Sequence, residues 1–498
     1  MKRKTISLKD KIWNRFSRGL IEFAEHLPST KKGVLAWLQN VRREQLSFKN
    51  SRPQHIELEL NTIWVCYLIP IEDFQKQVKS VVQILNEYRT KRFIGGFPLK
   101  RDVEILDELS KLKDGVYGTS WRNLGLLDFK NTPLEDKFNY AQFELQVSDG
   151  AFVSLIFRIN PAELFIQKIQ HIVDRNVAES QQIYPPRNFK ALFRGWWGGK
   201  TQNESYYKLN MIQSDIQDWK NDFSKMLRGF FSGYFMEANE VVPSLELWIS
   251  QQGHSPIAEN DRIHERMFWD SVGMQSSPFY RYSTDSFMQT IFWPDRKDDD
   301  YSIKYLVNTI HSNVSSGHSS IESEVAYSTN YWAPALLTAW SFRLLILDLN
   351  EHLLNLRLDL YNLLKKRIFY NPIKYAEMFL KRKTLLNRVF SVLQKQSLQR
   401  RFSGTGFPEF QSEDRRKGKT FLELLNGNTD FFKIESQGLL KENQELLDAT
   451  INAKVIKTNL RVQWGMFFLT LFTVLILLHD KSDDLSNLLS SIKQLFPN

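Results

Sequence analysis

The N-terminal segment places hydrophobic residues at every third or fourth position. These residues are Leu8, Ile12, Phe16, Leu20, Phe23 and Leu27. The spacing predicts an amphipathic helix, and the other faces of that helix are basic. A basic amphipathic helix can lie on an anionic membrane surface, or it can pack on its own domain and leave its basic face in water. We therefore predict a separate basic helical segment over residues 1–50, with both interpretations open.

Residues 51–250 show the patterns of an α/β domain. Ile56, Leu58 and Leu60 alternate with polar residues and lead into the nearly all-apolar run 63–69, which predicts a long strand. A helical pattern follows Pro70. Further on, residues 143–147 and 153–159 alternate on either side of Ser148-Asp149-Gly150. Asp-Gly between two alternating runs is a strong signal for a β-hairpin.

A second helix begins at Pro161, and the whole order is then strand, helix, hairpin, helix. This is the order of a ferredoxin-like β-α-β-β-α-β sandwich. Its last strand has two candidates, Tyr206–Ile212 and Ser244–Ile249, and residues 91–135 are predicted to be an insertion. Residues 251–330 read as a mixed, loop-rich region, with a Ser-rich loop over 311–328.

Long helices are predicted over residues 331–461. Leucines step by three or four positions from Leu345 to Leu363, which fits a helix of about 30 residues that is apolar on more than one face. Pro372 interrupts this pattern, and a second helix is expected from Ile373 to about Arg401. The predicted fold class is therefore α+β: an N-terminal ferredoxin-like α/β sandwich followed by a long-helix C-terminal region that ends in one transmembrane helix.

The transmembrane helix is predicted over residues 462–479. The run from Val462 to Leu478 has no charged residue, is apolar on every face and lies between Arg461 and Asp480. A buried core helix is the alternative for a run this short. The residues expected to anchor the chain are Trp464, Gly465, Phe467, Leu471, Leu475 and Leu478.

Residues 1–27 lack the continuous apolar region of a secretory signal, and basic residues precede the run more than they follow it. We therefore expect a single-pass protein of the cell membrane, with most of the chain in the cytoplasm and a short tail over residues 480–498 beyond the bilayer.

The positive charge of the chain is concentrated in two segments. The chain has 498 residues, a formal net charge of +10 and 42% hydrophobic residues, which excludes a disordered chain, and its mean hydropathy of −0.38 excludes a polytopic membrane protein. Residues 1–50 carry a net charge of +8 and residues 365–419 a net charge of +11, so the remainder is acidic. Basic blocks suit the phosphates of nucleic acids and of anionic lipids equally well.

The second basic block supplies the candidate binding residues. They are Lys365, Lys366 and Arg367; Lys381, Arg382 and Lys383; and Arg415, Arg416 and Lys417. Beside a membrane anchor these side chains suit a lipid headgroup, a phosphate or a nucleotide-type or other anionic ligand, although a solvated face is equally consistent. Nucleic acid is the weaker prediction, because the nearby aromatic residues equally serve helix packing.

The sequence contains no pattern typical of catalysis. Arg194 occupies the position where a phosphate-binding loop needs glycine, so the segment 194–201 is not expected to bind a nucleotide. The nine histidines form no metal signature, and the single Cys66 lies in an apolar run, which favours a buried, unreactive thiol. We therefore predict a protein that is not an enzyme and that has no metal site and no cofactor.

The C-terminal third resembles the CorA-like membrane protein superfamily in outline. The resemblance rests on the predicted helices over Ala335–Leu364, Ile373–Arg401 and Leu439–Leu478, which lead directly into the hydrophobic segment. Transporters of that family have two membrane helices and a Gly-Met-Asn motif at the pore, whereas Gly465-Met466 is followed here by Phe467. Single-anchor relatives in bacterial immune systems are similar in outline, with a cytoplasmic sensor domain before a membrane helix.

The leading hypothesis is therefore a tail-anchored bacterial membrane protein that forms homo-oligomers. Its cytoplasmic domain would sense a ligand or partner and act through the membrane helix, as a membrane effector of an anti-phage immune system does. One alternative is a soluble nucleic-acid-binding protein with basic patches. The other is a CorA-like divalent-cation transporter, as the resemblance implies.

Overall fold

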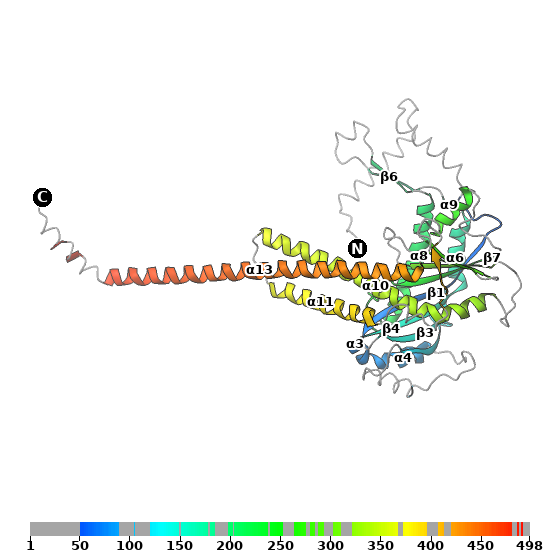
Figure 1. Cartoon of the computed structure of the whole chain (residues 1–498), viewed down its shortest axis with the longest axis horizontal. Helices are drawn as coiled ribbons and strands as arrows, with labels where there is room; N and C mark the ends of the chain where they lie inside the picture. The colour runs from blue at the N-terminus through cyan, green and yellow to red at the C-terminus, as the bar shows by residue number, and fades with distance from the viewer. Residues whose placement is uncertain are drawn as a thin grey trace, which may run out of the picture. The chain divides into compact units, whose positions relative to one another are not determined.

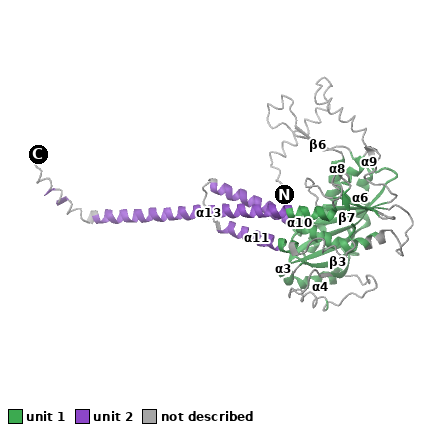
Figure 2. Ribbon diagram, viewed as in Figure 1, with its two compact units in different colours: residues 1–345, 389–430 green, residues 346–388, 431–498 purple. Residues whose placement is uncertain are grey.

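The structure is a computed structural model, and it divides the chain into two compact units (Figures 1 and 2). One unit takes residues 1–345 and 389–430, and the other takes residues 346–388 and 431–498. The structure describes residues 50–88, 104, 120–148, 151–177, 180–184, 198–202, 204–237, 240–251, 263–274, 279–283, 287–292, 302–309, 321–366, 372–395, 407–412, 420–480, 486–487 and 490–491. The predicted helix over residues 8–27 lies outside this range.

A nine-stranded mixed sheet forms the centre of the first unit, in the order β11-β8-β9-β10-β7-β1-β4-β3-β2. Only the pairing of β10 with β7 is parallel. The strands are β1 Glu57–Pro70, β2 Ser120–Asp128, β3 Phe138–Ser148, β4 Phe152–Pro161, β7 Ser244–Gln251, β8 Phe279–Ser283, β9 Phe287–Phe292, β10 Ser302–Thr309 and β11 Gln411–Ser412.

Strand β1 is central because the run from Ile63 to Ile69 is apolar on both faces, and a strand of this kind needs cover on both sides. It pairs with β4 on one side and with β7 on the other. Strands β3 and β4 form the predicted hairpin, with Ser148 opposite Phe152. The candidate Ser244–Ile249 is confirmed as a strand, β7, whereas the candidate Tyr206–Ile212 is wrong, because it lies in a helix.

Helices cover both faces of the sheet. On one face, the Tyr67 hydroxyl of β1 lies 2.9 Å from the Ser224 hydroxyl of α8 (Glu204–Leu227). On the other face, the Thr338 hydroxyl of α10 (Ile321–Lys366) donates to the side-chain oxygen of Gln146 at 2.8 Å. The remaining helices of this unit include α3 Ile71–Lys76, α4 Val78–Tyr88, α6 Glu163–Asp174 and α9 Ile263–Ser271.

The sheet continues beyond the segment predicted as the α/β domain. Strands β8, β9 and β10 come from residues 279–309, within the range predicted to be loop-rich, and β2 comes from the predicted insertion. Helix α10 begins at Ile321, so the last part of the predicted Ser-rich loop is helical. A separate two-stranded sheet joins β5 (Ser180–Tyr184) to β6 (Gly198–Gln202), which places Lys200 and Thr201 in a strand.

Cys66 lies in β1 with no exposed surface. Burial raises the pKa of its thiol to about 12, because the interior disfavours the thiolate charge. A thiol that stays protonated is a poor nucleophile, so the structure agrees with a buried, unreactive cysteine.

The second unit contains parts of three long helices: α10, α11 (Pro372–Lys395) and α13 (Phe421–Asp480) (Figure 2). Helices α10 and α13 run side by side in the same direction. The Ser436 hydroxyl donates to the side-chain oxygen of Asn350 at 2.6 Å, and the Asn443 amide donates to the Leu353 carbonyl at 3.1 Å. The structure is thus an α+β protein whose mixed sheet is followed by long C-terminal helices.

Candidate functional site

The last part of α13 is the strongest candidate for a functional surface. From Ile456 to Leu477 every residue of this helix is exposed, and the large apolar side chains among them are between 43% and 72% exposed. Burying apolar surface is the main driving force for folding, at about 25 cal/mol per Å². A helix that shows apolar side chains on all its sides therefore has the surface of a membrane span rather than that of an amphipathic surface helix.

The two threonine hydroxyls in the uncharged part of this stretch are satisfied by the helix itself. The Thr470 hydroxyl donates to the Met466 carbonyl at 2.8 Å, and the Thr473 hydroxyl donates to the Leu469 carbonyl at 2.8 Å. Because the hydrocarbon core offers no hydrogen-bond partners, a spanning segment needs this internal pairing. The two threonines therefore add little cost to insertion.

The predicted anchor residues all lie in this continuous helix. Trp464 contacts the rings of Phe467 and Phe468, with ring centroids 5.7 and 5.8 Å apart, at the end of the stretch where an interfacial aromatic group is expected. Gly465, Leu471, Leu475 and Leu478 lie on the same helix. The uncharged run of 17 residues rises by roughly 25 Å in a helix, slightly less than the roughly 30 Å of a hydrocarbon core.

One other described helix is long and apolar enough to cross a membrane. It is the part of α10 over Ser328–Leu364, and 89% of its most apolar window is buried inside the protein. Its apolar side chains contact protein, as when Trp332 meets the ring of Tyr305 at 5.1 Å, edge to face. We therefore assign the most apolar part of α10 to the protein interior, and α13 alone remains as a candidate span among the described residues.

The predicted basic residues lie partly on two described helices and partly outside the described residues. Lys365 and Lys366 lie at the end of α10, and Lys381, Arg382 and Lys383 lie on α11. Arg367, Arg415, Arg416 and Lys417 lie outside the described residues. Their role in binding an anion stays a prediction.

Two of the basic side chains on α11 have protein neighbours. The Lys383 ammonium lies 5.7 Å from the centre of the Phe379 ring. Burial lowers the pKa of Arg382, and the carboxylate of Asp348 on α10 partly offsets that effect. Burial raises the pKa of Asp348, and the nearby charges of His352 and Arg382 partly offset that effect.

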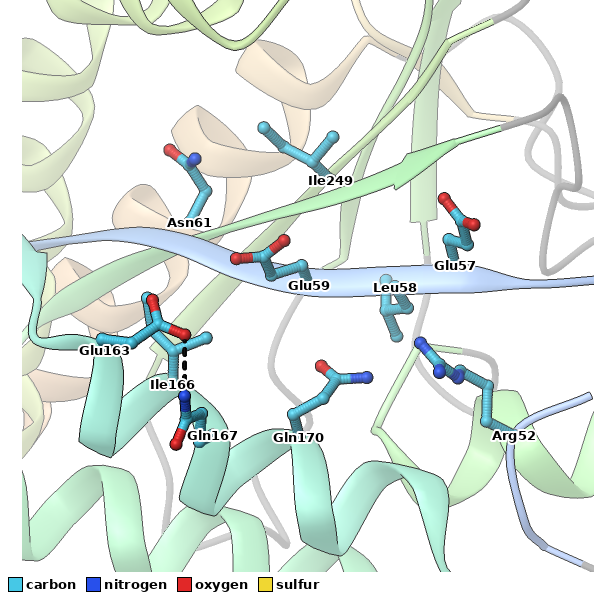
Figure 3. Close-up of a pocket in the computed structure, with 10 residues that line it drawn as sticks. All are labelled: Arg52, Glu57, Leu58, Glu59, Asn61, Glu163, Ile166, Gln167, Gln170 and Ile249. Carbon is cyan, nitrogen blue, oxygen red and sulfur yellow. Dashed lines mark hydrogen bonds between the residues drawn. The ribbon is translucent and has the colours of Figure 1, made fainter.

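The first unit has an open hollow of about 520 Å³ between β1 and α6 (Figure 3). Its lining is acidic and amide-rich around a small apolar floor. The lining residues are Arg52, Glu57, Leu58, Glu59, Asn61, Glu163, Ile166, Gln167, Gln170 and Ile249. Among the described residues, no group of three or more His, Cys, Asp or Glu side chains could hold a metal ion.

A buried clamp fixes the chain where it enters this region. The Asn50 side chain accepts a hydrogen bond from the Val177 amide at 2.8 Å and donates to the Val177 carbonyl at 2.9 Å. The Lys208 ammonium of α8 donates to the carbonyls of Asn50, Val173 and Arg175, at 2.5, 2.7 and 3.2 Å. Lys208 thus ties α8 to the end of α6 and to the first described residue of the chain.

Lys208 should make stability depend on pH. Burial lowers its pKa to about 7 from an ordinary 10.5. Between these values the unfolded chain holds a proton that the folded chain has released, so this contribution to the free energy of unfolding grows as pH rises from about 7 to about 10.5. As pH falls from about 10.5 to about 7 this contribution is lost progressively, and below about pH 7 both states hold the proton and it no longer changes with pH.

Urea unfolding of the wild type and of Lys208→Met at about pH 6.5 and pH 9 measures this effect. We expect the wild type to gain more stability than the variant on going to pH 9. An equal change in both proteins would show that Lys208 keeps its proton in the folded state.

The sequence pattern could not have revealed either the clamp or the hollow, because their residues come from positions far apart in the chain.

No protein-family model matches this chain, and no curated protein or solved structure matches it either.

Proposed function

We propose that this chain is a tail-anchored protein of the cell membrane, with the end of α13 as its single membrane-spanning helix. The observation that carries the proposal is the exposure of apolar side chains on all sides of α13 from Ile456 to Leu477. In water this surface would drive aggregation, whereas a hydrocarbon core buries it. The slight deficit in length is of the kind that local bilayer thinning accommodates.

The sheet unit is then the cytoplasmic domain, which senses a ligand or partner and is coupled through the long helices to the span. The strand order β7-β1-β4-β3, with antiparallel pairs and with helices on the β1-to-β3 and β4-to-β7 connections, supports a ferredoxin-like unit at the centre of the sheet. A membrane effector of a bacterial immune system is the role that this arrangement suits best.

Membrane fractionation of the full-length chain expressed in bacteria tests the anchor. We expect the protein in the membrane fraction, resistant to alkaline carbonate and released by detergent. Recovery as a soluble protein without detergent would overturn the proposal.

The same preparation gives the orientation. Because Cys66 is buried, a cysteine introduced as Ser490→Cys would be the only reactive thiol in the described parts of the chain. A membrane-impermeant maleimide added to intact spheroplasts should label it, whereas labelling only after lysis would place the tail on the cytoplasmic side.

We further propose that copies of the chain associate through α10. On this helix Leu347, Leu354, Leu358 and Tyr361 follow a spacing of seven, four and three, and Leu358 and Tyr361 are 55% and 58% exposed. An apolar stripe at this spacing is typical of a helix that pairs with another helix. Anchored copies share one membrane and one orientation, which favours parallel pairing.

The mass of the detergent-solubilised protein, measured by light scattering, tests this association. Leu358→Glu with Tyr361→Glu should reduce the oligomer to monomers, because glutamates would face each other across the pair. Leu380→Glu, at a comparably exposed leucine of α11, should leave the mass unchanged. A monomeric wild type would contradict the proposal.

A further inference from the structure

One face of α13 collects the polar side chains of the apolar stretch. In the uncharged run 462–478, the side chains with an amide or a hydroxyl group are those of Gln463, Thr470 and Thr473. They follow one another at intervals of seven and three residues on one continuous helix. Because an α-helix turns by about 100° per residue, the three side chains lie within an arc of about 80°. The rest of the run is apolar apart from the indole of Trp464.

The same face extends to both sides of these residues. Its positions are separated by four, three, four, three and four residues, which is the spacing of a helix that pairs with a parallel helix. All of them are exposed on α13. We call this surface the polar seam, and its residues are Asn459, Gln463, Met466, Thr470, Thr473 and Leu477.

The polar seam suits contact with protein better than contact with lipid. Hydrocarbon chains offer a polar side chain no hydrogen-bond partner, so the polar residues of spanning helices generally face other protein segments. The hydroxyls of Thr470 and Thr473 already donate to carbonyls of their own helix, but their oxygen atoms can still accept a hydrogen bond. Threonine is also small enough to let two helices approach each other closely.

A second copy of this chain carries the helix that matches the polar seam. Copies anchored by the same segment share one orientation, so equal residues lie at equal depths in the bilayer. The Gln463 amide has both donor and acceptor atoms, so it is complementary to the same amide of another copy. The association proposed through α10 would hold the two spans near each other and raise their effective concentration.

The basic residues before the run favour the polar seam over the opposite face as the contact. Lys454, Lys457 and Arg461 are exposed on α13, between about 120° and 180° around the helix axis from Gln463. Parallel copies that met through the opposite face would bring these like charges together, which is unfavourable. Contact through the polar seam keeps them apart and leaves them facing the lipid headgroups or water.

We propose that the spans of two copies of this chain pair in parallel through the polar seam of α13. This inference rests on the membrane anchor proposed above and names the surface by which the anchored spans meet. The contact lies in a different stretch of the chain from the apolar stripe of α10, and it adds to the association of that stripe.

Disulfide cross-linking in bacterial membranes tests which face of α13 meets the other copy. The seam variants are Met466→Cys and Leu477→Cys, and the matched controls are Phe468→Cys and Leu475→Cys. Each control lies two residues from its seam partner, at nearly the same depth but about 200° around the helix. All four positions are exposed, and the wild type, whose single cysteine is buried, gives the background.

Membranes washed with alkaline carbonate are oxidised by oxygen with copper phenanthroline, and disulfide-linked dimers are measured on a non-reducing gel. A disulfide needs the two Cβ atoms to come within about 3.5–4.5 Å, so the seam variants should form dimers at least about tenfold faster than their controls. Equal rates at all four positions, or faster dimer formation by the controls, would overturn the proposal.

The carbonate wash separates this result from the test of the anchor. Protein that stays in the membranes but forms no dimer at any of the four positions would overturn pairing of the spans and leave the anchor intact. Loss of the protein from the washed membranes would overturn the anchor and the seam together.

Removing the polar groups tests whether they hold the two spans together. Gln463→Leu with Thr470→Leu, in the Leu477→Cys background, should slow dimer formation by about three- to tenfold, as expected when one or two interhelical hydrogen bonds are lost. Because leucine favours insertion, this fall cannot come from a weaker anchor. Phe472→Leu with Ile476→Leu, on other faces of the helix, should leave the rate unchanged. An unchanged rate in the first variant would overturn the role of the polar side chains.

Discussion

Two arginines placed in the middle of the apolar stretch, Leu471→Arg with Leu475→Arg, are expected to release the chain from the membrane. Both leucines are exposed on α13, at 43% and 53%, so neither substitution disturbs a packed protein core. An arginine at the centre of a spanning helix costs about 2.5–3.5 kcal/mol on insertion scales. Two of them cost about 5–7 kcal/mol, which lowers membrane partition by more than about a thousandfold.

The control for this variant carries the same charges on other exposed apolar positions. Ile434→Arg on α13 and Leu380→Arg on α11 replace side chains that are 70% and 56% exposed. The control chain should stay in the membrane fraction, and both variants should keep the circular dichroism of the wild type. If the double arginine variant also stayed with the membrane after a carbonate wash, α13 would not be the anchor.

The elements that the sequence predicted well are those with strong local patterns. The long apolar run of β1, the hairpin of β3 and β4, and the helices α10, α11 and α13 each follow from periodicity within a short window. The same holds for the apolar end of α13, whose lack of any polar face is visible in the sequence alone. The exposure of that end agrees with the anchor prediction.

The elements that the sequence did not reveal depend on long-range contacts. Strands β8 and β9 are short and carry polar and aromatic residues in no clean alternation, so only the pairing of β9 with β10 and of β8 with β9 identifies them as strands. The clamp joins Asn50 to residues more than a hundred positions away. The hollow likewise combines β1 with α6, and no local pattern in either element indicates it.

Removing one aromatic ring from the centre of the sheet unit, Phe157→Ala, is expected to destabilise the protein severely. Phe157 has no exposed surface and stacks on Phe143, with ring centroids 4.5 Å apart and planes inclined by 12°. Tyr67 and Phe223 contact its other sides, edge to face, at 6.2 and 5.2 Å. Replacing a fully buried phenylalanine by alanine costs about 3–5 kcal/mol, a large part of the typical 5–15 kcal/mol of a domain.

The buried thiol of Cys66 reports this loss without any added probe. Phe157 pairs with Val65, the neighbour of Cys66 in β1, so opening of this part of the sheet exposes both. In the wild type the thiol should react with a maleimide only through opening of the sheet unit, because it is buried and stays protonated. If opening costs about 3–5 kcal/mol less in the variant, labelling under native conditions should be faster by at least about a hundredfold.

The matched control is Phe431→Ala, because Phe431 is 57% exposed and its removal leaves no cavity. Surface substitutions of this kind change stability by about 0.5 kcal/mol or less, so Cys66 should be labelled at nearly the wild-type rate. Equal labelling rates in Phe157→Ala and the control would mean that Cys66 is reached by a local fluctuation. Phe157 packs closely against three aromatic rings. The sheet therefore cannot open around β1 without separating β4 from the helix that covers it, and we expect Cys66 to be labelled faster in Phe157→Ala than in the control.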